Sequence, residues 1–131
     1  MVKPIGNRVV GASGVLLPIS AAVEVGDIVF LSGQMALIDG KIVGSDITAQ
    51  ANTIFDQIEV VLRDAGLSLR NVCKVTGWLT RREDFHHYNS VFAARFAAPF
   101  PTRSTVVSEL VVADALVEVE VIASRATLAP P

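Results

Sequence analysis

Two segments near the C-terminal end of the chain, residues 101–108 and 116–122, alternate in character with a period of two. This period is typical of β-strands, whose successive side chains point to opposite faces. In the second segment Val117, Val119 and Val121 form one wholly apolar face. Other elements must cover such a face, and this requirement limits the folds open to the chain.

Charged side chains interrupt both apolar strands. Arg103 lies in the first segment, and Glu118 and Glu120 lie in the second, on the face opposite the valines. A charge in such a strand needs a partner or a ligand, because desolvating an unpaired charge is costly. The alternative is that Arg103 and Glu120 reach solvent at strand ends. The presence of both an arginine and glutamates favours a functional site.

The remaining strand patterns precede these segments. Alternating or β-branched runs predict strands over residues 8–12, 22–34 (with a turn at Gly26 and Asp27) and 71–80. Asp39 and Gly40 lie between two short apolar runs, which predicts a hairpin with a type I′ turn.

Two segments have helical spacing. The first begins at Asp46, a suitable N-cap, ends near Gly66 and carries an apolar stripe from which Gln50 is excluded. The second follows residues 80–83, which match a capping box, and is stopped by prolines. Its aromatic stripe, which we interpret as core, consists of Phe85, Tyr88, Phe92 and Phe96.

This order of elements predicts an α+β fold in which two helices pack on one face of a mixed, largely antiparallel sheet. At 131 residues we expect a single domain over 1–131, with residues 124–131 as a flexible tail. The other sheet face would be uncovered in one protomer. Because 51% of the residues are hydrophobic, we expect copies of the chain to cover that face, forming a homo-oligomer.

Composition also narrows the function. No apolar run is long enough for a membrane helix or a signal peptide, and the single Cys73 cannot form an internal disulfide, so we expect a cytoplasmic protein. No Cys or His spacing matches a metal motif, and we expect no metal. A net charge of −2 without a basic cluster argues against nucleic-acid binding.

Seven pieces of the sequence, in order, resemble the Rid family of reactive-intermediate deaminases, also called the YjgF or L-PSP endoribonuclease family. They are residues 26–34, 46–50, 62–66, 72–76, 84–89, 101–105 and 115–120. The resemblance implies a chorismate-mutase-like (YjgF-type) trimer with a barrel-like centre and three sites at the subunit interfaces. It also implies cofactor-independent hydrolysis of enamines and imines, such as 2-aminoacrylate, to a 2-keto acid and ammonia.

The same resemblance assigns roles to individual residues. Arg103 would clamp the substrate carboxylate, and a planar guanidinium does bind a carboxylate through two parallel hydrogen bonds. Glu118 would hold and polarise the attacking water and move protons to the leaving nitrogen. The other positions that it places at the substrate or at Arg103 are Ser32, Gly33, Asn89 and Thr105.

Ile19 departs from the family pattern, in which better-characterised deaminases carry a tyrosine. Its apolar side chain predicts a bulkier or less polar imine than 2-aminoacrylate. Two alternatives stay open: a non-catalytic trimer that binds small carboxylic acids through Arg103, and an enzyme similar to 2-aminomuconate deaminase. Glu118 distinguishes the deaminase from the non-catalytic binder, because a protein that only binds anions has little use for a carboxylate beside them. The ribonuclease activity in the family's name ranks last for an acidic chain without a basic groove.

Overall fold

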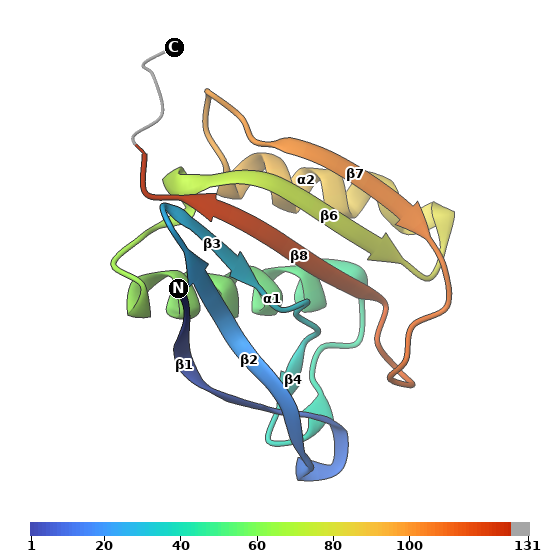
Figure 1. Cartoon of the computed structure of the whole chain (residues 1–131). Coiled ribbons are helices and arrows are strands. Elements are labelled where there is room, and N and C mark those ends of the chain that lie inside the picture. The colour runs from blue at the N-terminus through green and yellow to red at the C-terminus, as the bar shows by residue number, and fades with distance from the viewer. Residues whose placement is uncertain (127–131) are drawn as a thin grey trace.

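The structure is a computed structural model, and it describes residues 1–126 of the chain. A six-stranded sheet carries both α-helices on one face, behind the sheet in Figure 1, and a two-stranded hairpin lies beside it. The helices are α1 (Ile47–Asp64) and α2 (Phe85–Arg95). The strands are β1 (Val2–Val10), β2 (Leu16–Val25), β3 (Ile28–Leu31), β4 (Leu37–Ile38), β5 (Lys41–Ile42), β6 (Val72–Leu79), β7 (Thr102–Val107) and β8 (Val117–Ser124).

The strand order in the large sheet is β1-β2-β3-β8-β6-β7. All neighbouring pairs are antiparallel except β6 and β7, which are parallel and joined through α2. A parallel pair requires such a crossover, and a helix is its usual form. The predicted α+β fold, with two helices on one face of a largely antiparallel sheet, is confirmed.

Helix α1 begins and ends as its sequence predicts. The Asp46 carboxylate accepts a hydrogen bond from the Ala49 amide at 2.8 Å, which caps the first turn. Gly66 follows the last turn with a φ of +75°, a conformation that glycine adopts without strain. Ile54, Ile58 and Leu62 are fully buried on the helix face that covers the sheet.

The hairpin of β4 and β5 is also confirmed. Asp39 and Gly40 both have positive φ angles, of 52° and 78°, as a type I′ turn requires. The hairpin packs beside η1 (Ala12–Gly14), where the Gly40 carbonyl accepts a hydrogen bond from the Ser13 amide at 2.9 Å.

Gln50 differs from its prediction, because its side chain is buried in α1 with only 1% exposed. Its amide nitrogen donates to the Gly44 and Asp114 carbonyls at 3.0 and 3.1 Å, and its amide oxygen accepts from the Leu116 amide at 2.8 Å. These bonds use both N–H donors and one of the two acceptor positions of the buried amide, and they tie α1 to the segment before β8. The apolar period alone does not reveal this second buried edge of the helix.

The prediction of a capping box at residues 80–83 is wrong. A 3₁₀ turn, η3 (Arg82–Asp84), separates β6 from α2, and its N-cap is Arg81, which makes no side-chain capping bond. Instead the Arg81 guanidinium pairs with the Asp84 carboxylate at 2.9 Å. A capping box does occur in η2 (Leu69–Asn71), between Ser68 and Asn71.

The first residues of the tail predicted over 124–131 belong to the folded domain. Ser124 is the last residue of β8, and Arg125 pairs with Glu24 and donates to the Ala65 carbonyl at 2.8 Å. Residues 127–131 of that predicted tail lie outside the described residues. Within residues 1–126 no helix has the length and apolar character needed to cross a membrane.

Candidate functional site

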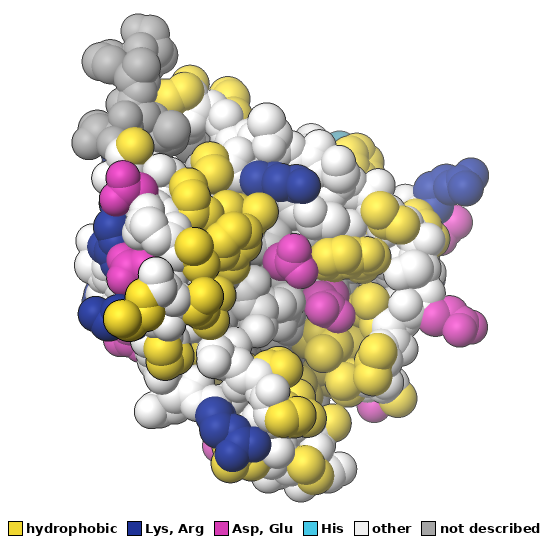
Figure 2. Space-filling view, viewed as in Figure 1, with side chains coloured by type: hydrophobic (Ala, Val, Ile, Leu, Met, Phe, Trp, Pro, Cys, Tyr) yellow, Lys and Arg dark blue, Asp and Glu magenta, His cyan; other side chains and the backbone are white. Residues whose placement is uncertain are grey.

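The pleat of β8 separates its valines from its glutamates. Val117, Val119 and Val121 point to the helix-covered face and are buried, whereas Glu118 and Glu120 point to the open face. Figure 2 shows this open face, with acidic side chains standing among hydrophobic ones near its centre. The carboxylates therefore lie in an apolar setting, as the alternation of β8 predicts.

A cleft of about 1030 Å³ lies on the open face beside Glu118; we call it the open-face cleft. Its walls come from β2, the segment after β3, β8 and the segment before β8. It brings together four of the residues predicted for the site, which are Ile19, Ser32, Gly33 and Glu118. Gln50 holds the wall that contains Asp114, so a buried amide missed by the sequence pattern helps to shape the cleft.

Gly33 is held directly against the Glu118 carboxylate. On one side of it, the Ser32 hydroxyl donates to the Ser20 carbonyl at 2.6 Å. On the other, Gln34 and Val119 exchange two backbone hydrogen bonds of 2.8 and 3.0 Å. A Cβ at residue 33 would overlap the Glu118 Oε2 atom, so the observed position of the Glu118 carboxylate depends on glycine at this residue.

The Glu118 carboxyl has a perturbed acidity. Its partial burial raises its pKa above the ordinary glutamate value, and the negative charge of Glu120 raises it further. A carboxyl with a raised pKa exchanges protons nearer to neutral pH than an exposed glutamate does. Glu118 is therefore suited to accept a proton from water and return it.

Gly33→Ala tests the close approach of backbone and carboxylate. The added methyl would displace the Glu118 carboxylate, and a shift of about 1 Å in a reacting group costs about 10²-fold in rate. For the imine hydrolysis that the sequence resemblance implies, we expect kcat/KM to fall by about that factor, while the free energy of unfolding changes by less than about 1 kcal/mol because a flexible side chain absorbs the contact. Steady-state kinetics and urea unfolding measure both quantities. An unaltered kcat/KM would show that this approach does not position Glu118.

Arg103 lies on the opposite, helix-covered face of the sheet. In the parallel register Arg103 is the partner of Val75, which is fully buried and is itself the partner of Val121. The Arg103 Nη1 group donates to Asn89 Oδ1 at 2.8 Å. Its guanidinium carbon lies 4.6 Å from the centre of the Phe92 ring, within the range of a cation–π contact.

Phe85 completes the setting of Arg103. Its ring centre is 5.4 Å from the guanidinium carbon, and the side chain is 41% exposed, so Phe85 is not the core residue that its helical spacing predicts. Thr105 lies on the same face two residues along β7, beside Arg103. We call Arg103, Asn89 and Thr105 the Arg103 cluster.

The predicted site residues thus form two groups on opposite faces of one sheet. The open-face cleft contains Glu118 and the Arg103 cluster lies under α2, so one protomer does not bring the two groups together. Sequence alternation assigns faces within a strand. It does not show whether Arg103 on β7 and Glu118 on β8 lie on the same face of the sheet, because that depends on how both strands are paired with β6 between them.

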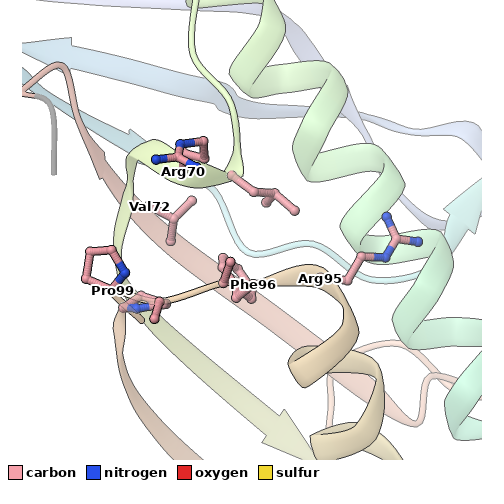
Figure 3. A pocket seen from close by; sticks show the side chains of 9 residues that line it. Arg70, Val72, Arg95, Phe96 and Pro99 are labelled. Atoms are coloured by element: carbon pink, nitrogen blue, oxygen red, sulfur yellow. The ribbon is translucent and has the colours of Figure 1, made fainter. Parts of the chain in front are cut away.

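A second, smaller hollow of about 90 Å³ lies at the C-terminal end of α2 (Figure 3). Arg70, Val72, Phe96 and Pro99 line it, and none of the predicted site residues does. Arg95 at its edge is directed at α1, where it pairs with Asp56 at 2.8 Å. This hollow therefore offers little chemistry. Over residues 1–126, no three His, Cys, Asp or Glu side chains gather in a group suited to a metal ion.

Comparison with known proteins gives consistent matches. The family model described as endoribonuclease L-PSP matches residues 12–125. A RutC family protein of Pyrococcus abyssi is 36% identical over 110 residues, covering 82% of this chain and 87% of its own. Reactive Intermediate Deaminase A, chloroplastic, of Arabidopsis thaliana is 33% identical over 115 residues, covering 86% of this chain and 62% of its own. The crystal structure of RidA from an Antarctic Psychrobacter species superposes with a TM-score of 0.81 at 31% identity, covering 93% of this chain and 98% of that one.

Proposed function

The chain belongs to the endoribonuclease L-PSP family, which includes the Rid and YjgF proteins, and on that premise we propose that it hydrolyses carboxylate-bearing imines and enamines to 2-keto acids and ammonia. The observation that carries the proposal is Glu118, a half-buried carboxyl of raised pKa that projects into an apolar cleft. Such a group serves proton transfer. Reactive imines are already electrophilic, so orientation, water and a proton suffice for their hydrolysis.

In the proposed reaction, Arg103 holds the substrate carboxylate through two parallel hydrogen bonds. Glu118 takes a proton from a water molecule as the water oxygen forms a bond with the imine carbon. The carboxyl then gives that proton to the nitrogen. Glu118 then takes the remaining proton of the former water and passes it to the same nitrogen, so that the carbonyl forms, the carbon–nitrogen bond breaks and ammonia leaves. An enamine first gains a proton on carbon and loses one from nitrogen, which gives the imine.

We further propose that the reaction site forms between copies of the chain, in a homotrimer. Arg103 and Glu118 lie on opposite faces of one protomer, so a site that contains both requires two protomers. The open face also carries exposed apolar side chains, including Phe30 and Val106, which a second copy would cover. A location in the cytoplasm fits the unpaired Cys73.

The alternative function is binding of small carboxylic acids without turnover. The Arg103 cluster favours it, because a guanidinium held over aromatic rings is enough to bind a carboxylate. The two functions differ in their need for Glu118. A binder would retain its affinity when Glu118 becomes glutamine, whereas the enzyme would lose its turnover.

An imine-diversion assay tests the proposed function. An amino-acid oxidase generates 2-imino acids from several amino acids, and semicarbazide traps the imine as it forms. We expect the protein to divert the imine to the 2-keto acid before it is trapped. If no imine is diverted while small carboxylates bind in an Arg103-dependent manner, the protein is a binder.

Ile19→Tyr tests the choice of substrate. Ile19 lines the open-face cleft and is 43% exposed, so a phenol there would narrow the cleft and add a hydroxyl. We expect the ratio of kcat/KM for small imines to that for bulky apolar imines to rise about tenfold, as pocket-size changes commonly give. If the substrate resembles that of 2-aminomuconate deaminase, which is also larger than 2-aminoacrylate, we expect Ile19→Tyr to lower its kcat/KM relative to that of small imines.

The control for this substitution is Ile38→Tyr, at an exposed isoleucine of β4 that does not line the cleft. It should leave the substrate ratio unchanged. A wild-type protein that already turns over 2-aminoacrylate as fast as a relative with tyrosine at this position would contradict the expected preference for bulkier imines.

A further inference from the structure

Two buried hydroxyl groups lie on the helix-covered face without hydrogen-bond partners among residues 1–126. They are Tyr88 Oη, on α2, and Thr105 Oγ1, on β7. Tyr88 is fully buried. A buried hydroxyl without a partner is costly, and a phenylalanine at residue 88 would fill the same space without that cost. The tyrosine hydroxyl therefore needs an explanation beyond packing.

Gly77 on β6 makes the space that this hydroxyl enters. A Cβ at residue 77 would lie 2.6 Å from Tyr88 Oη and 3.1 Å from Tyr88 Cζ. A glycine within a strand weakens it and often marks a close approach by another group. In the parallel register the β7 partner of Gly77 is Thr105. The gap at Gly77 thus brings the phenol toward the strand position that carries the other unpaired hydroxyl.

The nearby arginine cannot be the hydrogen-bond acceptor of the Tyr88 hydroxyl. The Arg103 guanidinium carbon is 6.0 Å from the centre of the Tyr88 ring, and a guanidinium is only a donor. Burial raises the pKa of the Tyr88 hydroxyl to about 12, although the charge of Arg103 lowers it, so the phenol keeps its proton at neutral pH. Arg103 offers this proton no acceptor, whereas the Thr105 hydroxyl can accept a hydrogen bond.

We propose that Tyr88 is a positioning residue for Arg103: the Tyr88 hydroxyl donates to one buried water, and that water donates to the Thr105 hydroxyl past Gly77. This bridge fixes the part of β7 from which Arg103 projects. Together with the bond from Arg103 to Asn89, it holds the guanidinium in one orientation. The role in substrate binding rests on the proposed function, whereas the hydroxyl pair itself does not.

A double-mutant cycle tests the proposal with Tyr88→Phe, Thr105→Val and the double variant, all nearly isosteric. Loss of one hydrogen bond that orients the clamp is expected to raise KM about fivefold to tenfold with a smaller change in kcat. The double variant should be no worse than either single variant, because both remove the same bridge. Unaltered KM together with an unaltered or raised unfolding midpoint in Tyr88→Phe would overturn the proposal.

Tyr88 is the only tyrosine in the chain, which provides a readout that does not depend on activity. Protein labelled with ¹³C at tyrosine Cζ gives one signal, and we expect Thr105→Val to shift it and to lower the unfolding midpoint. A 2-keto acid should shift the signal in the wild type but not in Arg103→Ala. If the wild type neither turns over imines nor responds to 2-keto acids, the proposed function fails, and a signal unmoved by Thr105→Val overturns the hydroxyl pair.

Discussion

Arg103→Ala is expected to reduce kcat/KM for 2-imino acids by about 10² to 10⁴. Two charge-assisted hydrogen bonds to the substrate carboxylate would be removed, each worth about 1.5–3 kcal/mol. Stability should change little, because Arg103 makes one side-chain hydrogen bond, to Asn89, and pairs with no carboxylate in residues 1–126. Initial rates in the imine-diversion assay, with urea unfolding of the same samples, measure both effects.

Two further variants show whether the loss of kcat/KM in Arg103→Ala comes from losing the two parallel donors of the guanidinium rather than its charge alone. Arg103→Lys keeps the charge but not the two parallel donors, so most of the loss should remain. Arg81→Ala removes a more exposed arginine that is paired with Asp84 and belongs to neither half of the site, and it should keep full activity. Activity of Arg103→Ala within about threefold of the wild type would rule out the carboxylate clamp, given the energy of such bonds.

Glu118→Gln is expected to lower kcat by about 10² to 10⁴, the usual effect of removing a general acid or base, with little change in KM. Glutamine keeps the shape of the side chain but accepts no proton from water. Stopped or continuous assays at saturating imine measure kcat directly. Unchanged turnover with unchanged KM would show that another group transfers the proton.

The pH dependence identifies Glu118 as the titrating group. Its ionised form must accept the water proton, so kcat/KM should rise with pH through the Glu118 pKa, which burial and Glu120 place above the ordinary glutamate value. Glu120→Gln is the matched control. It removes a negative charge that raises the Glu118 pKa, so the same rise in kcat/KM should move to lower pH. A rise at the pH of an exposed glutamate, or one unmoved in Glu120→Gln, would contradict this assignment.

The sequence was sufficient for α1, the hairpin and the local faces of the strands, but β1 (Val2–Val10) and β2 (Leu16–Val25) begin about six residues before the strands predicted over 8–12 and 22–34. Asp46, Gly66 and the Asp39–Gly40 turn act through bonds or angles within a few residues, so their patterns predict the observed structure. The alternation of β8 likewise places Glu118 opposite the valines. Each of these features depends only on neighbours in the chain.

Features that depend on distant partners were missed. Two of the three bonds of Gln50 reach Asp114 and Leu116, more than 60 residues away, so the local apolar stripe does not predict that this amide is buried. The contact of Gly33 with Glu118 and that of Gly77 with Tyr88 depend on how the segments pack. The separation of Arg103 from Glu118 follows from the register of β6 between their strands, which no single segment encodes.

In the proposed site Arg103 of one protomer acts together with Glu118 of another, and mixing two inactive variants shows whether they share a site. Arg103→Ala and Glu118→Gln are unfolded together, refolded at equal amounts and assayed for imine diversion. Random assembly of closed trimers with one such pair at each interface would restore about one quarter of the wild-type sites. Recovery near that level is the predicted result. A mixture no more active than the separate variants, with mixed assembly verified by mass spectrometry, would contradict the shared site.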